Sequence, residues 1–472
     1  MMNRSRIWIV LCCLAALLAT APPVRAYSVL THEQLIDLTW ETSIVPLLKS
    51  RYPTLTPAQI EHARAYAYGG CVIQDIGYYP FGDPFFSDLT HYVRSGDFVV
   101  NLFRNAGNAD ELAFAVGALS HYIGDTVGHA GATNLAVPVE FPKLRQRYGS
   151  SVNYAQGEHQ HVQTEFAFDI NEIAHHRFAP VHYLRHVGLA VPTGQLALAF
   201  YQTYGVRNDF STHRGSRINV DGYRFAVRNF IPRIAYAVTV LHRKHEPAEV
   251  MDADLQKLQA EITAVAAKND WDSYRKKPGI GTYSLAAFLY ILPKIGPIKL
   301  VAVKGPTQAT ESEYVHSVVR SSDELNRALR RFTPPPATVG SGGTAAAVGS
   351  VPKLAVGMLS AEESAQRQDP QHPLANRDLD TGVVVKPGGY RLTDDTYAGL
   401  LQRLAEHPMD PVPPGIRDDI LLYYADLNQP FATKKKPEQW AALQRNLQTL
   451  RTMPTSTAPE PYATYGDSEE AQ

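Results

Sequence analysis

One long apolar segment, residues 110–124, most constrains what this chain can fold into. Its apolar residues recur on nearly every side of a helical projection, which predicts a buried central helix. The segment leads into His121-Tyr-Ile-Gly-Asp125, and a separation of four places both side chains on one helix face. A carboxylate buried there is costly unless it is neutralised or paired. A divalent cation such as zinc is a natural partner, and a hydrogen-bonded His–Asp pair in the core is the alternative.

A second pair, His161-Val-Gln-Thr-Glu165, repeats this spacing on another predicted helix. Taken alone, this pair is better explained as a solvated helical ion pair. Four further residues of ligand type accompany the two pairs: His32, Asp75, His91 and His129. Together they favour a multinuclear zinc site in a helical bundle. Such a site ionises a bound water near neutral pH and can hold the attacking and leaving oxygens of a phosphoester.

Composition and motifs narrow the class of protein. Helical periodicity is widespread and strand-like alternation is scarce, so we predict an all-α fold. The 45 Lys+Arg and 46 Asp+Glu residues balance, which gives no reason to expect a nucleic-acid partner. The sequence has no Gly-x-Ser-x-Gly elbow, no Walker-type phosphate loop and no Gly-x-Gly-x-x-Gly. Cys71 lacks a supporting nucleophile motif, and we interpret it as a buried structural thiol.

The first 26 residues have the pattern of a secretory signal peptide. Arg4 and Arg6 precede an apolar run, and Ala26 is a small residue at a plausible cleavage position. Cleavage there would make Tyr27 the mature N-terminus and predicts a secreted or periplasmic protein. An uncleaved membrane anchor is the alternative, although the apolar run is short for a membrane span.

The remaining chain divides by composition. We predict a helical domain with an extension over 27–332, a Pro/Gly/Ser/Ala-rich linker over 333–350, a small helical region over 351–453 and a disordered tail over 454–472. Within the first region, 71–90 is expected to be a long ordered loop rich in aromatic residues, and 131–157 to be irregular. The apolar run 283–292 is either a buried helix or a lipid-facing surface segment.

The ligand motifs resemble the zinc-dependent phospholipase C family over roughly residues 27–180. The likeness rests on Thr31-His32, the Asp75…His91 segment, His121-x3-Asp125, a following His129, and His161-x3-Glu165. The related fungal-type zinc nucleases share this order of ligands. The resemblance implies an all-α, multi-helix zinc phospholipase C-like bundle, here with a helical C-terminal extension, and up to three Zn²⁺ ions.

The resemblance also assigns ligands. One zinc would be held by Asp75, His91, His121 and Asp125. A second would be held by Tyr27, through its terminal amine and carbonyl, and by His32, with Asp125 bridging the pair. A third would be held by His129, His161 and Glu165. In the family the residue at Asp75 is also the candidate that orients or deprotonates the attacking water.

The chain departs from the family pattern at two places, and the second leaves open which side of the phosphate is cleaved. The mature chain would begin with Tyr27 rather than Trp, and His129 follows Asp125 by only four positions. The short spacing resembles the zinc domain of glycosylphosphatidylinositol-specific phospholipase D, so cleavage on either side of the phosphate is compatible with it.

Three functions therefore compete: a phospholipid phosphodiesterase, a nuclease or nucleotidase with the same metals, and a non-catalytic metal-binding protein. For the first we expect a phospholipid substrate, transient contact with a membrane surface and no obligate protein partner. Five aromatic residues are candidates for an apolar wall that contacts the lipid or its choline: Tyr78, Tyr79, Phe81, Phe85 and Phe86.

Overall fold

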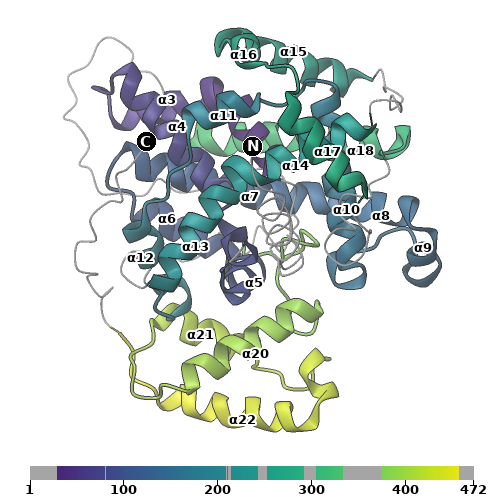
Figure 1. The fold of residues 1–472 in the computed structure, drawn as a ribbon. Coiled ribbons are helices and arrows are strands. Elements are labelled where there is room, and N and C mark those ends of the chain that lie inside the picture. The colour runs from purple at the N-terminus through teal and green to yellow at the C-terminus, as the bar shows by residue number, and fades with distance from the viewer. Residues whose placement is uncertain are drawn as a thin grey trace, which may run out of the picture.

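The computed structural model describes residues 29–79, 81–208, 210, 214–242, 252–291, 305–332 and 374–456. The predicted signal peptide, Tyr27 and the predicted linker lie outside these residues. Helices dominate the described part, in which extended pairing is limited to two isolated bridges, Arg377–Val384 and Val412–Thr455. The all-α expectation is therefore confirmed (Figure 1). None of the described helices is both long enough and apolar enough to span a bilayer.

The described helices follow one another along the chain. They are α2 (Val29–Thr39), α3 (Val45–Arg51), α4 (Pro57–Gly70), α5 (Pro84–Tyr92), α6 (Ser95–Arg104), α7 (Ala109–Gly128), α8 (Asn134–Glu140), α9 (Pro142–Tyr148), α10 (Glu158–Ala174), α11 (Val181–Val187), α12 (Thr193–Tyr204), α13 (Arg214–Phe225), α14 (Ile231–His242), α15 (Ala253–Lys268), α16 (Trp271–Tyr274), α17 (Ile280–Ile291), α18 (Gln308–Phe332), α20 (Arg391–Ala405), α21 (Pro414–Tyr423) and α22 (Pro437–Thr452). The turns with helical geometry are η1 (Trp40–Ile44), η2 (Ile73–Tyr78), η3 (His129–Thr133), η4 (Tyr154–Gln156), η5 (Ala226–Phe230) and η7 (Ala432–Lys435).

Helix α7 is the buried central helix that the apolar segment predicts. It starts at the N-cap Asn108, whose side chain accepts a hydrogen bond from the Glu111 amide. It packs against α2, α4, α6 and α18, so nearly all of its faces are covered. At the crossing with α4, a Cβ on Gly117 would lie 2.3 Å from the Ala67 carbonyl oxygen. The two backbones therefore approach more closely than any side chain would allow.

Two segments expected to be irregular are helical instead. Residues 71–90 form η2 and α5, because Asp83 caps the Phe85 amide and Pro84 fits the first turn of a helix. Residues 131–157 contain η3, α8, α9 and η4, with Pro142 again in a first turn. In both segments the Gly and Pro content signalled where helices begin and end rather than a loop.

Helix α17 covers most of the apolar run 283–292. Only Ala286 and Leu289 are buried, and they pack on residues of α10 and α14. Ile280, Tyr290 and Ile291 are 87%, 75% and 80% exposed. The expectation of a buried helix is wrong for the described residues, because the apolar side chains surround the helix while only one face meets a partner.

Helices α20, α21 and α22 form a layer on one side of the molecule (Figure 1). Helix α20 contacts α5, where the Phe85 ring lies against Gly399. Buried leucines of this layer belong to the same apolar cluster as α7. The C-terminal layer thus shares its core with the helices that carry the predicted ligands.

Candidate metal centre

Six elements bring eight of the nine predicted ligands together. These are α2, η2, α5, α7, η3 and α10. Three buried groups of side chains result, and within each group one ligand atom per residue lies within 4.8 Å of the others. The first group is His32, His121 and Asp125; the second is Asp75, His91 and His121; the third is His129, His161 and Glu165.

Asp125 lies at the middle of the centre. Its Oδ1 is 3.2 Å from Nε2 of His32 and 4.0 Å from Nε2 of His129. Its Oδ2 is 3.2 Å from Nε2 of His121 and 3.4 Å from Nε2 of His91. Gly124 makes room for this arrangement, since a Cβ there would lie 3.3 Å from the His32 ring. One carboxylate therefore faces four imidazoles that come from three helices and the turn η3.

The second group joins η2 and α5 to α7. The distance between Asp75 Oδ1 and His91 Nε2 is 3.4 Å, and the two Nε2 atoms of His91 and His121 are 3.5 Å apart. The His121 ring also stacks on His32, with ring centroids 4.3 Å apart. The first two groups consequently share His121 and lie side by side.

The third group joins η3 to α10. Glu165 Oε1 lies 3.1 Å from His129 Nε2 and 3.0 Å from His161 Nε2. The His161–Glu165 pair is one helical turn apart on α10, as its spacing predicts, and it is fully buried rather than solvated. The four-residue step from Asp125 to His129 therefore still delivers His129 to Glu165.

Backbone carbonyls orient three of the imidazoles. Nδ1 of His91 bonds Ser87 O at 2.7 Å, and Nδ1 of His121 bonds Cys71 O at 3.0 Å. Nδ1 of His129 bonds Leu379 O at 2.9 Å. Because a carbonyl only accepts, each Nδ1 carries the proton and each Nε2 is left to face the centre. This is the outer arrangement typical of metal-ligating histidines.

Neighbouring charges and burial strongly shift the pKa values of the ligand side chains. Burial alone would lower the pKa of His91, but Asp125 and Asp75 outweigh it and raise that pKa to about 10. Burial is likewise outweighed at His129, where Asp125 and Glu165 raise the pKa to about 10. For Asp75 burial dominates and raises the pKa. At Asp125 burial is outweighed by the imidazoles of His121 and His129, which hold the pKa of that carboxyl well below its usual range.

The residues present fit a metal. The carboxylate oxygens of Asp75, Asp125 and Glu165 are buried and receive no hydrogen bond from the described part of the chain. Buried carboxylates of that kind need a cation, and their nearest neighbours are the imidazole nitrogens of the same groups. A mixed set of imidazole and carboxylate ligands suits zinc. The site can thus hold several zinc ions close together.

The start of α2 is fixed by a residue that the sequence analysis missed. Asp169 accepts hydrogen bonds from the Leu30 amide at 3.2 Å and from the Thr31 hydroxyl at 2.8 Å. It stands one helical turn beyond Glu165 on α10, so it continues the series His161, Glu165, Asp169 at steps of four. That series is the signal that would have found it. Asp169 holds the chain just after Tyr27, which itself is not described.

The other histidines considered for the site stay outside it. His159 is exposed, so the structure brings His161 and not His159 to Glu165. His175 bonds the Asn171 carbonyl at the end of α10, and His176 contacts Arg275. Cys71 is a free, buried thiol whose pKa is raised by burial, which suits the structural role inferred for it.

The five aromatic residues do not form one exposed wall. Tyr78, Tyr79 and Phe86 are buried, although the Tyr78 ring lies 5.8 Å from that of His91. Phe85 is covered by the Arg403 guanidinium 3.9 Å from its ring centroid, and only Phe81, 73% exposed, faces outward. Helix α5 buries Phe86 but not its neighbour Phe85, and Tyr78 and Tyr79 are buried at the end of η2.

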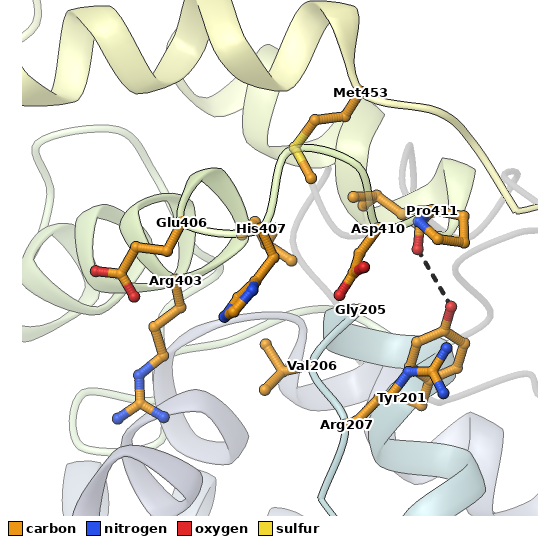
Figure 2. A pocket seen from close by; sticks show the side chains of 12 residues that line it. Tyr201, Gly205, Val206, Arg207, Arg403, Glu406, His407, Asp410, Pro411 and Met453 are labelled. Carbon is orange, nitrogen blue, oxygen red and sulfur yellow. Dashed lines mark hydrogen bonds between the residues drawn. The ribbon is translucent and has the colours of Figure 1, made fainter.

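A pocket of about 430 Å³ lies elsewhere, between the end of α12 and the C-terminal layer (Figure 2). Its lining mixes charges of both signs, among them Arg403, Glu406 and Asp410, and Tyr201 donates a hydrogen bond across it to the Pro411 carbonyl. None of the predicted metal ligands lines it. The pocket is therefore separate from the metal centre.

Comparison with known proteins agrees with the centre. A search of curated proteins and a search of solved structures each returned no significant match. Residues 31–208, by contrast, match the family model described as zinc dependent phospholipase C. This span contains all eight of the described ligand candidates and supports a zinc-dependent, phospholipase C-like hydrolase. The resemblance seen in the ligand motifs is thereby confirmed: residues 31–208 carry the pattern of the zinc dependent phospholipase C family.

Proposed function

We propose that this protein is a secreted zinc-dependent phosphodiesterase that hydrolyses phospholipids by metal-activated water. The observation that carries the proposal is Asp125, a buried carboxylate among four imidazoles, with Asp75 and Glu165 beside it. Three adjoining ligand groups are more than a structural zinc needs, since structural sites are closed, four-coordinate and usually rich in cysteine. Adjoining metals suit in-line attack on a phosphoester.

Each ligand residue would have its own role in hydrolysis. Zinc bound here would supply a water that ionises near neutral pH. Asp75 is the candidate to orient that water or take its proton, because its buried carboxylate lies in the second ligand group beside His91 and His121. His91 and His121 flank it, and Nε2 of His91 lies 3.4 Å from its Oδ1. Tyr27 would complete the first group through its terminal amine once the signal peptide is removed.

Two other functions use the same centre. A nuclease or nucleotidase would need aromatic rings exposed for base stacking, and among the five candidates only Phe81 is largely exposed. A non-catalytic metal-binding protein was suggested by the short Asp125–His129 spacing, yet that spacing still delivers His129 to Glu165. Phospholipid hydrolysis is therefore the function we favour.

The experiment is product analysis on labelled phosphatidylcholine with zinc-loaded protein whose N-terminus is Tyr27. Diacylglycerol would establish cleavage of the C type, and phosphatidic acid would establish the D type. Single-stranded DNA and nucleoside monophosphates serve as competing substrates. Zinc-loaded protein that hydrolyses none of them would leave the non-catalytic function. Retaining extra residues before Tyr27 should lower both zinc content and activity, and unchanged zinc content would remove the terminal amine from the ligand set.

We further propose that α17 is the surface that meets the membrane. It carries no charged residue, and it exposes Ile280, Tyr283, Tyr290 and Ile291. Helix α17 packs on α14, whose Arg233 belongs to a group of cations with Arg185, Arg228 and Lys276. An apolar helix face with cations beside it fits a bilayer interface that contains anionic lipid.

A vesicle-binding assay tests this surface. Burying an isoleucine side chain contributes about 1.5–3 kcal/mol, so Ile291→Ser should weaken binding to mixed phosphatidylglycerol–phosphatidylcholine vesicles by about tenfold or more. Leu422→Ser is the matched control, because Leu422 is 73% exposed in the C-terminal layer. Hydrolysis of a monomeric short-chain lipid should be the same in both variants. Equal vesicle binding by the two variants would contradict the role of α17.

A further inference from the structure

The segment 374–385 reaches the metal centre from outside the family match. It follows a stretch of chain that the structure does not describe, and it precedes the C-terminal layer. It runs across the ends of α5, α6 and α7, to which it is joined by backbone and side-chain hydrogen bonds. Tyr122 of α7 donates to the Ala375 carbonyl at 2.7 Å, and Ser95 donates to the Arg377 carbonyl at 2.6 Å.

Leu379 contacts two predicted ligands at once. Its amide donates to the His91 carbonyl oxygen at 3.1 Å, and its carbonyl accepts the proton on Nδ1 of His129 at 2.9 Å. The residue is fully buried. His91 belongs to the second ligand group and His129 to the third. Leu379 therefore links the two groups, and it does so through the His91 carbonyl and the His129 Nδ1 rather than through the Nε2 atoms that face the centre.

Asp380 fixes the peptide that follows. Its carboxylate accepts hydrogen bonds from Tyr92 at 2.8 Å and from Tyr390 at 2.6 Å, and its carbonyl accepts one from Asn134 at 2.7 Å. All three donors and Asp380 itself are buried. The carbonyl of Leu379 is thus held on both sides and presents a fixed acceptor to His129.

The segment lies directly on the turn that carries Asp125 and His129. Gly382 adopts φ +70°, and a Cβ there would lie 2.6 Å from the Thr126 carbonyl oxygen. Its amide closes a turn onto the Asp378 carbonyl at 2.9 Å. Only glycine permits both the positive φ and this approach, so the sequence of the segment is itself adapted to α7.

We propose that segment 374–385 is an outer layer of the metal centre, with Leu379 as a positioning residue that orients His129 toward the third zinc. The proposal rests on the proposed metal centre but not on the identity of the substrate. It gives the C-terminal region a function: without the segment, the His129 ring loses the acceptor that sets its tautomer and direction. Outer partners of this kind change metal affinity by about 10–100-fold.

The test compares two glycine substitutions of nearly equal backbone strain. Gly382→Ala pushes the segment away from α7. Gly388→Ala, at φ +69° six residues later, instead crowds Pro430 in the C-terminal layer. Zinc content is measured after dialysis against graded concentrations of chelator, with no substrate present. Both variants should unfold at lower temperature than the wild type. Only Gly382→Ala should release its most weakly held zinc at a chelator concentration at least about tenfold lower than the wild type requires.

The outcomes separate the proposal from the function beneath it. Wild-type protein that holds no zinc would refute the metal centre. Wild-type protein that holds zinc, together with equal chelator resistance in the two variants, would refute the role of the segment alone. If Gly382→Ala fails to fold, the pair Tyr390→Phe and Tyr397→Phe replaces it, since each removes one hydrogen bond from a buried tyrosine to a carboxylate and only the first supports Asp380. Cobalt loading adds a spectroscopic readout, in which only Tyr390→Phe should change the visible spectrum.

Discussion

Replacing Asp125 by asparagine is the most informative single change in this centre. The variant keeps the volume of the side chain but replaces one carboxylate oxygen by an amide nitrogen, which cannot ligate a metal. Both oxygens are committed in the structure, Oδ1 toward His32 and Oδ2 toward His121, each at 3.2 Å. The first two ligand groups should therefore lose affinity together, and a centre of uncompensated histidines would remain in the core.

The size of the effect can be bounded. Loss of an outer partner weakens metal binding by about 10–100-fold, so loss of a bridging ligand should reach at least about 100-fold. That corresponds to about 2.8 kcal/mol at 1.4 kcal/mol per tenfold change. The assay is the chelator concentration at which half of the zinc is released, measured by elemental analysis on wild type and variant in parallel.

Asp394→Asn is the matched control for this change. Asp394 is equally buried and accepts hydrogen bonds from Tyr423, Gly388 and Ala432, but it lies in the C-terminal layer. We expect Asp394→Asn to lose stability while keeping its zinc. The reasoning fails if Asp125→Asn keeps wild-type zinc content and chelator resistance, or if the two variants lose zinc to the same degree.

The same geometry makes three further predictions. Zinc loading near pH 8 should release about two protons, because His91 and His129 have pKa values of about 10 before zinc binds and zinc binds only the neutral ring. Calorimetry in buffers of different ionisation enthalpy measures the number of protons released. For the same reason, zinc affinity should keep rising as the pH approaches 10. Asp169→Ala should release the start of α2 and so lower both the melting temperature and the zinc occupancy. If the melting temperature falls while zinc occupancy stays full, Asp169 only caps the helix and does not support the metal centre. Chelation of the zinc should lower the melting temperature by several degrees. A metal present at about 100 times its Kd adds about 2.7 kcal/mol to the free energy of unfolding, and each kcal/mol shifts the melting temperature by about 2–4 °C. An unchanged melting temperature after chelation would argue against bound metal.

The helices that carry ligands could be predicted because their histidine and carboxylate residues stand at helical spacing. His121 with Asp125, and His161 with Glu165, stand four residues apart in segments whose apolar pattern is helical. A buried carboxylate in such a segment demands a partner, so the metal could be inferred from the residues alone. The fold class followed from the same periodicity.

Other parts of the fold carried signals that are weaker or absent. In α18 the buried residues Val315, Val318, Leu325 and Leu329 have helical spacing and could have been recognised, as could the Asp83–Pro84 start of α5. The exposure of α17 could not, because whether an apolar helix face is covered depends on its neighbours. The role of Leu379 could not have been predicted either. Leu379 acts through its backbone amide and carbonyl, which every residue other than proline has, so its residue type gives no signal.

The short step from Asp125 to His129 has a structural explanation that bears on activity. Helix α7 ends at Gly128, and the wider turn η3 begins at His129. The two side chains therefore stay on one face, with Oδ1 of Asp125 4.0 Å from Nε2 of His129, while His129 also comes within 3.1 Å of Glu165. The stretch from His121 to His129 thus contributes to all three ligand groups at steps of four residues. Because the four-residue step still assembles the third group, it gives no reason to regard the centre as inactive.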